Sequence, residues 1–381
     1  MTSLAALLNG PTPPDEDLVD QARPGHGIPS QDPDPAAQRV LEPEDAAREA
    51  QSVWVGGGVV AGAATGAAVG VMVAGPVGVA VGSALGAVAG AVGGAMAGAT
   101  DGLADPERLD AKSRGRVNLY IEDTGGSGRP LVLIHGWPLS AQAWAPQVPA
   151  LQAAGFRVVA YDRRGFGRSE KPHSAYSYDE LADDLQQVMD QCTLEDVTLV
   201  GFSMGGGEVA RYMGRWGQSR VHSAVFAAAV TPCLMRSADN PDGPLTQERA
   251  LQKKSALEQD RDGYFEQFVT DFFSANEVLQ VTLAQRADAV ALCHQSAQHA
   301  ALACMDAFAS TDFRADLKKV TVPTLVIHGT ADGIVPIEGS GMRTHRAVPH
   351  SQLVTVGDAP HGFNLSHAQA FNDALLAFLR T

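Results

Sequence analysis

The chain has 381 residues, with 43 Asp and Glu against 28 Lys and Arg, and a formal net charge of −15 at pH 7. This acidic balance disfavours nucleic acids and anionic membrane surfaces as electrostatic partners. The four cysteines show neither a disulfide nor a zinc spacing, which fits a reducing cytoplasm.

Residues 1–50 hold ten acids, three arginines and eight prolines. Such a segment cannot bury enough apolar surface to fold alone, and we predict a disordered acidic, proline-rich tail. Its first residues lack the basic start and long apolar run of a signal peptide, so we expect no cleavable leader and a cytoplasmic location.

No charged residue occurs in residues 51–100, and glycines recur every four positions from 58 to 70 and again from 78 to 98. On a helix, residues four apart share a face, so each run would give a smooth strip for close backbone packing. This glycine zipper predicts an apolar helical hairpin. Its arms, 53–73 and 77–99, are each long enough to cross roughly 30 Å of hydrocarbon.

Three interpretations of this hairpin stay open. The segment is mostly Gly, Ala and Val, so its transfer energy into a membrane is modest, and each glycine costs helix stability at about 1 kcal/mol in water. Membrane association is favoured, contact within a homo-oligomer comes second, and an unstructured linker is third.

From residue 113 to 381 the pattern is that of one α/β domain of about 270 residues. An apolar run, 131–134, opens into His135-Gly-Trp137-Pro138, and a second run, 157–161, ends at Asp162. Both are typical of buried parallel strands, whose following loops often carry catalytic side chains.

Residues 197–206 read Val-Thr-Leu-Val-Gly-Phe-Ser-Met-Gly-Gly, with a strand pattern before Ser203 and a helix pattern after it. A side chain at the tip of a strand-to-helix turn is held in strained backbone and needs small neighbours two positions away. Gly201 and Gly205 meet that need. The segment therefore predicts a nucleophile elbow.

Residues 232–310 interrupt the strand pattern and are predicted to be helical, in the position of a lid over the strand ends. Residues 261–273 supply several aromatic side chains to this region. Phe272 and Phe273 are candidates to face substrate, although aromatics at helical spacing are more often core residues.

Two further strands are predicted near the end of the chain. The run 324–329 opens into a loop that carries Asp332, and the run 352–357 is followed by a turn with His361. A serine hydroxyl is a weak nucleophile, so an imidazole must take its proton and a carboxylate must orient that imidazole. The order Ser203, Asp332, His361 fits these roles.

Other residues compete for these roles. His135 and His328 lie at strand ends before glycine and are expected to be structural. The rival acids are Asp162, Asp306, Asp312 and Asp358. Asp162 precedes a tight turn, where an aspartate more often accepts from backbone donors.

The anion formed on a carbonyl needs preorganised N–H donors. We expect these from the main chain of Met204, after the serine, and of Trp137, in the loop after strand 131–134. The predicted substrate pocket consists of Trp137, Pro138, Phe202, Phe272 and Phe273. The sequence has no H-E-x-x-H and no zinc-type spacing, so we expect neither a metal nor another cofactor.

Four motifs together carry a family resemblance: residues 135–138, 161–169, 201–212 and 329–336. They resemble the α/β-hydrolase superfamily, and within it the cofactor-free bacterial chloroperoxidase and aryl-esterase branch, over about residues 113–381. The resemblance implies a mostly parallel sheet flanked by helices and an esterase triad that also uses hydrogen peroxide to make a peracid, with no haem or metal. Proline after the loop tryptophan, as in Pro138, is taken to favour peroxide over water. Ser203 argues against the related haloalkane dehalogenases and epoxide hydrolases, which use an aspartate.

The leading hypothesis is a serine hydrolase of small apolar carboxylic esters, with perhydrolase or haloperoxidase activity. Its partners would be an ester or carboxylic acid and hydrogen peroxide. Serine alone does not separate ester hydrolysis from lactone, thioester or carbon–carbon cleavage. One alternative makes the hairpin at 51–100 the principal actor, with the hydrolase domain as cargo or ligand-binding module. Another is a degenerate hydrolase that only binds a ligand.

Overall fold

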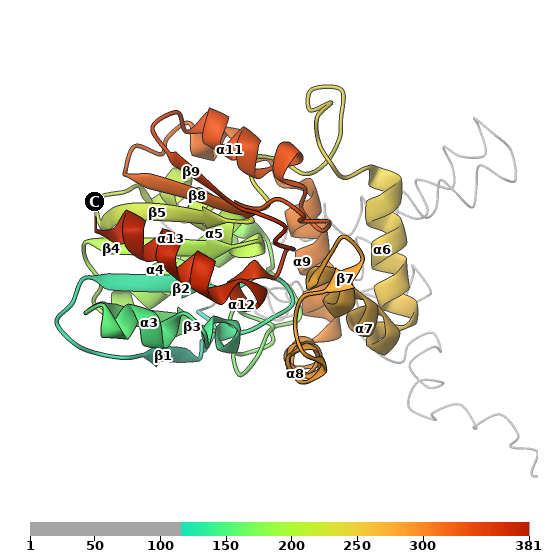
Figure 1. Cartoon of the computed structure of the whole chain (residues 1–381), viewed down its shortest axis with the longest axis horizontal. Helices are drawn as coiled ribbons and strands as arrows, with labels where there is room; N and C mark the ends of the chain where they lie inside the picture. The colour runs from blue at the N-terminus through green and yellow to red at the C-terminus, as the bar shows by residue number, and fades with distance from the viewer. Residues whose placement is uncertain (1–115, 381) are drawn as a thin grey trace, which may run out of the picture. The chain divides into compact units, whose positions relative to one another are not determined.

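The computed structural model describes residues 116–380, which form a seven-stranded sheet with helices on both faces (Figure 1). The sheet strands are β1 (Ile121–Asp123), β2 (Pro130–Ile134), β3 (Arg157–Tyr161), β4 (Val197–Phe202), β5 (Val221–Ala227), β8 (Thr324–Gly329) and β9 (Gln352–Val356). They lie in the order β1-β3-β2-β4-β5-β8-β9. β1 runs antiparallel to β3, and all other neighbours in this sheet are parallel. The tail and hairpin expected at 1–50 and 51–100 lie outside the described residues.

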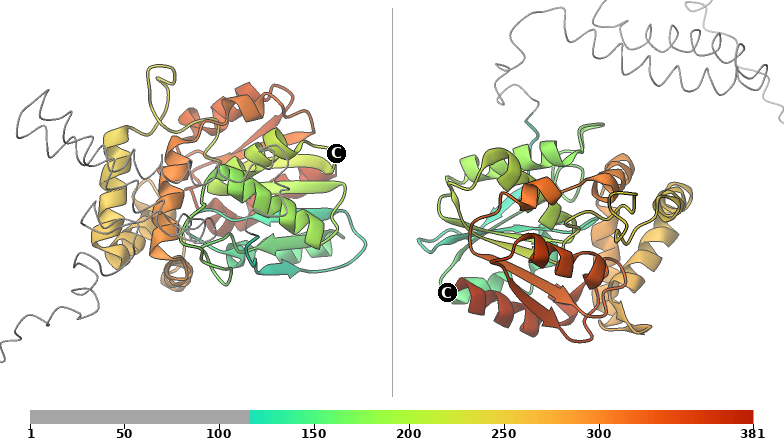
Figure 2. Two further views of the ribbon diagram at one scale, coloured as in Figure 1. Left: turned by 180° about the vertical axis from the view of Figure 1, so that it is seen from behind. Right: turned by 90° about the horizontal axis from the view of Figure 1, so that it is seen from above.

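The helices are α3 (Val148–Ala153), α4 (Tyr178–Gln191), α5 (Met204–Trp216), α6 (Gln247–Gln259), α7 (Arg261–Phe272), α8 (Leu283–His294), α9 (Gln298–Ser310), α10 (Arg314–Leu317), α11 (Gly341–Ala347), α12 (Phe363–Ser366) and α13 (Ala368–Leu379). Short 3-10 turns occupy Ala141–Trp144 and Ile337–Gly339. Figure 1 shows α3 and α13 in front of the sheet, and the view from behind in Figure 2 shows α4 and α5 over the other face. Among residues 116–380, none of the helices combines the length and apolar character needed to cross a bilayer.

The central strands are apolar throughout because both sheet faces are covered. Every residue of β4 and of β8 is buried. This is why these strands appear in the sequence as continuous apolar runs rather than alternating patterns. Since β2, β4, β5 and β8 are parallel and in register, their carboxyl ends open at one edge of the sheet. The loops after them therefore meet there.

Helices α6 to α9 gather beyond the carboxyl ends of the strands, on the side away from the chain's C terminus (Figure 1). The predicted helical segment 232–310 is therefore helical mainly from residue 247 onward, with a two-stranded hairpin of β6 (Ser274–Ala275) and β7 (Val278–Leu279). Residues 232–246 form a loop. The Asn240 side chain donates to the carbonyls of Cys233 and Met235, and prolines at 241 and 244 oppose helix formation.

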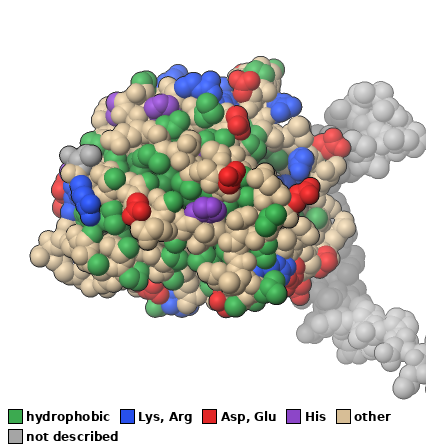
Figure 3. Space-filling view, viewed as in Figure 1, with side chains coloured by type: hydrophobic (Ala, Val, Ile, Leu, Met, Phe, Trp, Pro, Cys, Tyr) green, Lys and Arg blue, Asp and Glu red, His purple; other side chains and the backbone are tan. Residues whose placement is uncertain are grey.

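The surface of this domain carries charges of both signs. On the face drawn in Figure 3, acidic and basic side chains lie as small separate groups among apolar and uncharged atoms. Several of the acids are paired, as in the bridge between Arg157 and Asp123. Exposed pairs of this kind contribute little stability, so the buried apolar core and the buried polar contacts near the sheet edge dominate.

Candidate active site

Ser203 lies at the turn between β4 and α5 with φ 54° and ψ −116°, a backbone conformation that L residues rarely adopt. The close approach of neighbouring segments explains its glycines. An added Cβ at Gly201 would meet the carbonyl of Gly205, and one at Gly205 would meet the carbonyl of Ile134. The turn therefore holds the Ser203 side chain at the carboxyl edge of the sheet.

Two loops from distant parts of the sequence bring their side chains to this serine. The Nε2 atom of His361 lies 2.8 Å from the Ser203 hydroxyl oxygen. On the other side of the ring, Nδ1 lies 2.6 Å from a carboxylate oxygen of Asp332. All three side chains are buried or nearly so, with His361 1% exposed. The three residues thus form one continuous hydrogen-bonded chain.

Asp332 is held by more than His361. Its Oδ1 atom accepts from the main-chain N–H groups of Ile334 and Val335, at 2.9 and 2.8 Å. Its Oδ2 atom lies 3.1 Å from Nε2 of His328. Burial raises the pKa of the Asp332 carboxyl, but His361 and the hydrogen bond from His328 outweigh it and hold the pKa well below its ordinary value. The carboxylate is therefore charged at neutral pH.

The rival acids lie in other contacts. Asp162 accepts from the main-chain N–H groups of Ala141 and Arg168, as expected for an aspartate in a tight turn. The carboxylates of Asp306 and Asp312 form ion pairs, with Lys254 and Arg314 respectively. Asp358 is exposed. Among residues 116–380, only Asp332 has a carboxylate hydrogen-bonded to His361.

The two expected main-chain donors are available. Within residues 116–380, neither the Trp137 N–H nor the Met204 N–H has a hydrogen-bond acceptor. The indole of Trp137 donates instead through Nε1 to the carbonyl of Ala301, at 3.0 Å, which fixes the side chain. Unpaired buried N–H groups are rare in proteins, so these two are suited to bind an oxyanion.

A buried ion pair lies near the nucleophile turn. Nε of Arg163 lies 2.8 Å from Oε2 of Glu208 on α5, and both side chains are fully buried. Arg163 also donates to the carbonyl of His135, at 2.7 Å. Tyr161 donates to the other oxygen of Glu208. These contacts connect α5, which follows Ser203, with the loop that carries Trp137.

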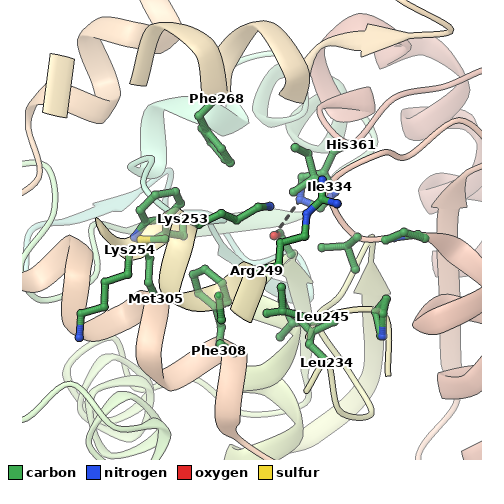
Figure 4. Close-up of a pocket in the computed structure, with 18 of the residues that line it drawn as sticks. Leu234, Leu245, Arg249, Lys253, Lys254, Phe268, Met305, Phe308, Ile334 and His361 are labelled. Atoms are coloured by element: carbon green, nitrogen blue, oxygen red, sulfur yellow. Dashed lines mark hydrogen bonds between the residues drawn. The ribbon is translucent and has the colours of Figure 1, made fainter. Parts of the chain in front are cut away.

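A cavity of about 240 Å³ contains both Ser203 and His361 in its wall (Figure 4). Its apolar wall includes Trp137, Leu234, Tyr264, Phe268, Met305 and Phe308. The Trp137 ring packs edge-on against Phe268, with 5.1 Å between ring centroids. Helices α6, α7 and α9 all contribute to this wall, so the predicted lid region does cover the site.

Of the five residues predicted to form the pocket, only Trp137 lines this cavity. Pro138, Phe202, Phe272 and Phe273 are buried outside it. On α7, Tyr264 and Phe268 line the cavity, whereas Phe272, on the same face, lies one turn further along and contacts the His361 ring. The prediction for these four residues is corrected accordingly.

Phe202 and Phe272 instead pack around the base. Their rings lie 5.3 and 5.2 Å from the His361 ring, centroid to centroid. The carbonyl of Phe272 also accepts from the Gly362 N–H, at 2.7 Å. These aromatic residues therefore position the imidazole.

Sequence reasoning missed the contact of His328 with Asp332 and the basic residues of α6 in the cavity wall, Arg249, Lys253 and Lys254. The only available signal for the latter was the spacing of Arg249 and Lys253, four positions apart in a helical segment. Among residues 116–380, no cluster of three or more His, Cys, Asp or Glu side chains is arranged to hold a metal ion.

A comparison with models of known protein families shows to which family this chain belongs. The model described as alpha/beta hydrolase fold matches residues 129–368. The chain belongs to the α/β-hydrolase family. This confirms the resemblance and the fold class inferred from the sequence.

Similar individual proteins indicate to which branch of the family this α/β-hydrolase belongs. It is 42% identical over 266 residues to a putative non-heme chloroperoxidase of Synechocystis sp., covering 69% of this chain and 95% of that protein. It is 35% identical to a bifunctional esterase/perhydrolase of Acinetobacter calcoaceticus, with 70% and 97% covered. A bromoperoxidase structure from Bacillus anthracis matches with 46% identity and a TM-score of 0.68, covering 70% of this chain and 97% of that one.

These relatives show that the α/β-hydrolase is an enzyme of the chloroperoxidase and esterase branch. They agree with the serine hydrolase inferred from Ser203, Asp332 and His361. The alternative in which residues 51–100 are the principal actor receives no support from them. Those residues lie outside the part of the chain that the structure describes.

Proposed function

We propose that this α/β-hydrolase cleaves carboxylic esters through an acyl-enzyme formed on Ser203. Ser203 Oγ attacks the carbonyl carbon while its proton passes to Nε2 of His361, and Asp332 stabilises the resulting imidazolium. The oxyanion accepts hydrogen bonds from the Trp137 and Met204 N–H groups. The proton on His361 then goes to the departing alkoxide. Water hydrolyses the acyl-enzyme by the same route in reverse.

The observation that carries this proposal is the continuous hydrogen-bonded chain from Ser203 through His361 to Asp332, with a cavity at the serine. Two unpaired main-chain donors beside the serine support it further. The apolar wall of the cavity, with Trp137, Phe268 and Phe308, suits the hydrocarbon part of a small ester.

We propose perhydrolysis as a second activity of the same site. A carboxylic acid would acylate Ser203 with release of water, and hydrogen peroxide would then attack the acyl group to give a peracid and free serine. The peracid would oxidise halide ions in solution, so no metal takes part in the step. The bifunctional esterase/perhydrolase relative favours this proposal.

One experiment tests both activities. Esters of increasing acyl chain length are hydrolysed with and without hydrogen peroxide, by the full chain and by Ser203→Ala. We expect Ser203→Ala to lower kcat by on the order of 10⁵–10⁶ for hydrolysis and to abolish peracid formation. Full activity of Ser203→Ala would contradict the proposal, and peracid formation without Ser203 would separate the two activities.

A further inference from the structure

The cavity that contains Ser203 carries an excess of positive charge. Three basic side chains of α6 line it, Arg249, Lys253 and Lys254. Lys254 is neutralised by Asp306 on α9, with 2.6 Å between the charged atoms. Within residues 116–380, the side chains of Arg249 and Lys253 take part in no ion pair and no hydrogen bond. Two positive charges therefore remain without a bonded partner in a chain whose formal net charge is −15.

These two cations lie on the same face of α6. Residues four apart are neighbours on a helix surface, and like charges at this spacing are destabilising. Arg249 is exposed at the rim, whereas Lys253 is partly buried. In Figure 4 the Lys253 side chain extends across the cavity toward the hydrogen bond drawn at His361. Such an arrangement costs stability unless an anion occupies the space between.

The electrostatic surroundings of Lys253 fit this interpretation. Burial and then the charge of Arg249 lower the pKa of the Lys253 ammonium, and Asp271 opposes them. Among residues 116–380, Asp306 is the only carboxylate in the cavity wall. The rest of that wall is mostly apolar, so a bound anion would find its complementary charges on α6.

We propose that the substrate carries a carboxylate separate from the carbonyl that Ser203 attacks, and that Lys253 and Arg249 bind this carboxylate. The proposal rests on the proposed function, because it takes Ser203 as the nucleophile. The substrates are then half-esters of dicarboxylic acids and related anionic esters. Hydrolysis of a half-ester consumes one water and releases the alcohol and the dicarboxylate. Charge-assisted hydrogen bonds from an ammonium and a guanidinium to a carboxylate are among the stronger polar contacts in proteins.

The test compares two esters of nearly equal shape with the full-length protein. Monomethyl glutarate carries a carboxylate where methyl 5-methylhexanoate carries an isopropyl group. We expect kcat/KM for the anionic ester to exceed that for the neutral ester by about tenfold or more, and the ratio to fall as salt is added. A second pair, 4-(butanoyloxy)butanoate and its isopropyl counterpart, places the charge on the alcohol side. A preference for the anionic ester in either pair supports the proposal and shows whether the carboxylate lies on the acyl side or on the alcohol side of the ester.

Variants of the basic residues on α6 test whether they cause the preference for the anionic ester. Lys253→Met and Arg249→Met should each lower the ratio of the two kcat/KM values by about tenfold, because each removes a charged partner of the carboxylate. Lys253→Arg should keep most of the ratio. Asp306→Asn should raise it, since Lys254 is then unpaired. The control is Lys318→Met, which removes an exposed lysine directly after α10 and should leave the ratio of the two kcat/KM values unchanged.

Equal kcat/KM for the esters of both pairs, or ratios that Lys253→Met and Arg249→Met leave unchanged, would overturn the carboxylate proposal. Labelling by a fluorophosphonate probe distinguishes a failure of the carboxylate proposal from a failure of the proposed function. If Ser203 is labelled and the neutral esters are hydrolysed, only the carboxylate proposal fails. If Ser203 is not labelled and no ester is hydrolysed, the proposed function fails with it.

Discussion

Asp332 uses its two carboxylate oxygens for different purposes. Oδ1 is fixed by the main-chain N–H groups of Ile334 and Val335, while Oδ2 faces His361 and His328. Asp332→Asn would keep an oxygen for the two amides but place an NH₂ group against His361. The imidazole would then be driven into the wrong tautomer.

We therefore predict that Asp332→Asn lowers kcat for p-nitrophenyl acetate by on the order of 10⁴, and that it also lowers stability, because its NH₂ group would face the N–H of His328. Steady-state kinetics and thermal unfolding measure the two effects. The matched control is Asp358→Asn, an exposed acid three residues before His361, which should keep its activity. A larger loss in the control than in Asp332→Asn would contradict the assignment.

His135 predicts a pH effect on stability. Burial, followed by the charge of Arg163, lowers the pKa of His135 from 6.5 to about 3. Below pH 6.5 the unfolded chain binds a proton at this site and the folded chain does not. This residue therefore makes the free energy of unfolding decrease as the pH falls from about 6.5 to 3, by up to about 1.4 kcal/mol per pH unit.

Urea unfolding at pH 7 and at pH 4.5 checks this effect. The loss of stability between the two values should be smaller in His135→Gln than in the wild type, because glutamine does not titrate. An equal loss in both proteins would show that His135 is not held neutral in the folded state.

At the scale of elements, α5 is connected to the loop after β2 through the buried pair of Arg163 and Glu208. Removing one partner of a buried ion pair leaves the other charge uncompensated. Glu208→Gln should lower the free energy of unfolding by about 3–5 kcal/mol, measured by urea denaturation. Glu266→Gln, at an exposed pair with Arg286, should lower it by less than about 1 kcal/mol. Similar losses in both variants would refute a special role for the buried pair.

The meeting of the strand loops could be predicted from the sequence, whereas the side chains that the covering helices bring to the cavity could not. Ser203, Asp332 and His361 each follow a buried parallel strand, and parallel strands open their carboxyl ends at one edge, so their meeting follows from the order of apolar runs. How far along α7 the cavity extends depends on how the helix packs on its neighbours, since Phe268 and Phe272 lie four residues apart on one face. Phe268 lines the cavity, whereas Phe272, predicted to do so, lies one turn further along and packs against the His361 ring.

The same limit explains the basic side chains of α6. In sequence, Arg249 and Lys253 resemble ordinary residues of a solvated helix face, and this helix has only one fully buried residue, Leu257. Only the packing of α6 against α9 places its basic residues in the wall of the cavity. The segment 232–246 before α6 was predicted to be helical but forms a loop, because its prolines and the side-chain hydrogen bonds of Asn240 oppose a helix.

At the scale of the whole molecule, Ser203, Asp332, His361 and the described cavity wall lie within 116–380. We propose that residues 113–381 are the catalytic domain and that 51–100 serve another purpose, for which membrane contact and homo-oligomer contact stay predictions. Deleting residues 51–100 should then leave kcat/KM for a neutral ester unchanged. Size-exclusion chromatography and membrane fractionation of the full and shortened chains would show whether assembly or location changes. Loss of hydrolysis in a shortened chain that keeps its circular dichroism would contradict this division.

The proposed mechanism requires Ser203 to act as the nucleophile and to become acylated during the reaction. The most direct measurement labels this nucleophile with a fluorophosphonate, whose phosphorus the Ser203 oxygen attacks with loss of fluoride, and locates the added mass by peptide mass spectrometry. We expect one adduct, on the peptide that contains Ser203, with none in Ser203→Ala and a much slower reaction in a His361→Ala variant. An adduct on another residue, with Ser203 unmodified while the enzyme loses activity, would contradict it.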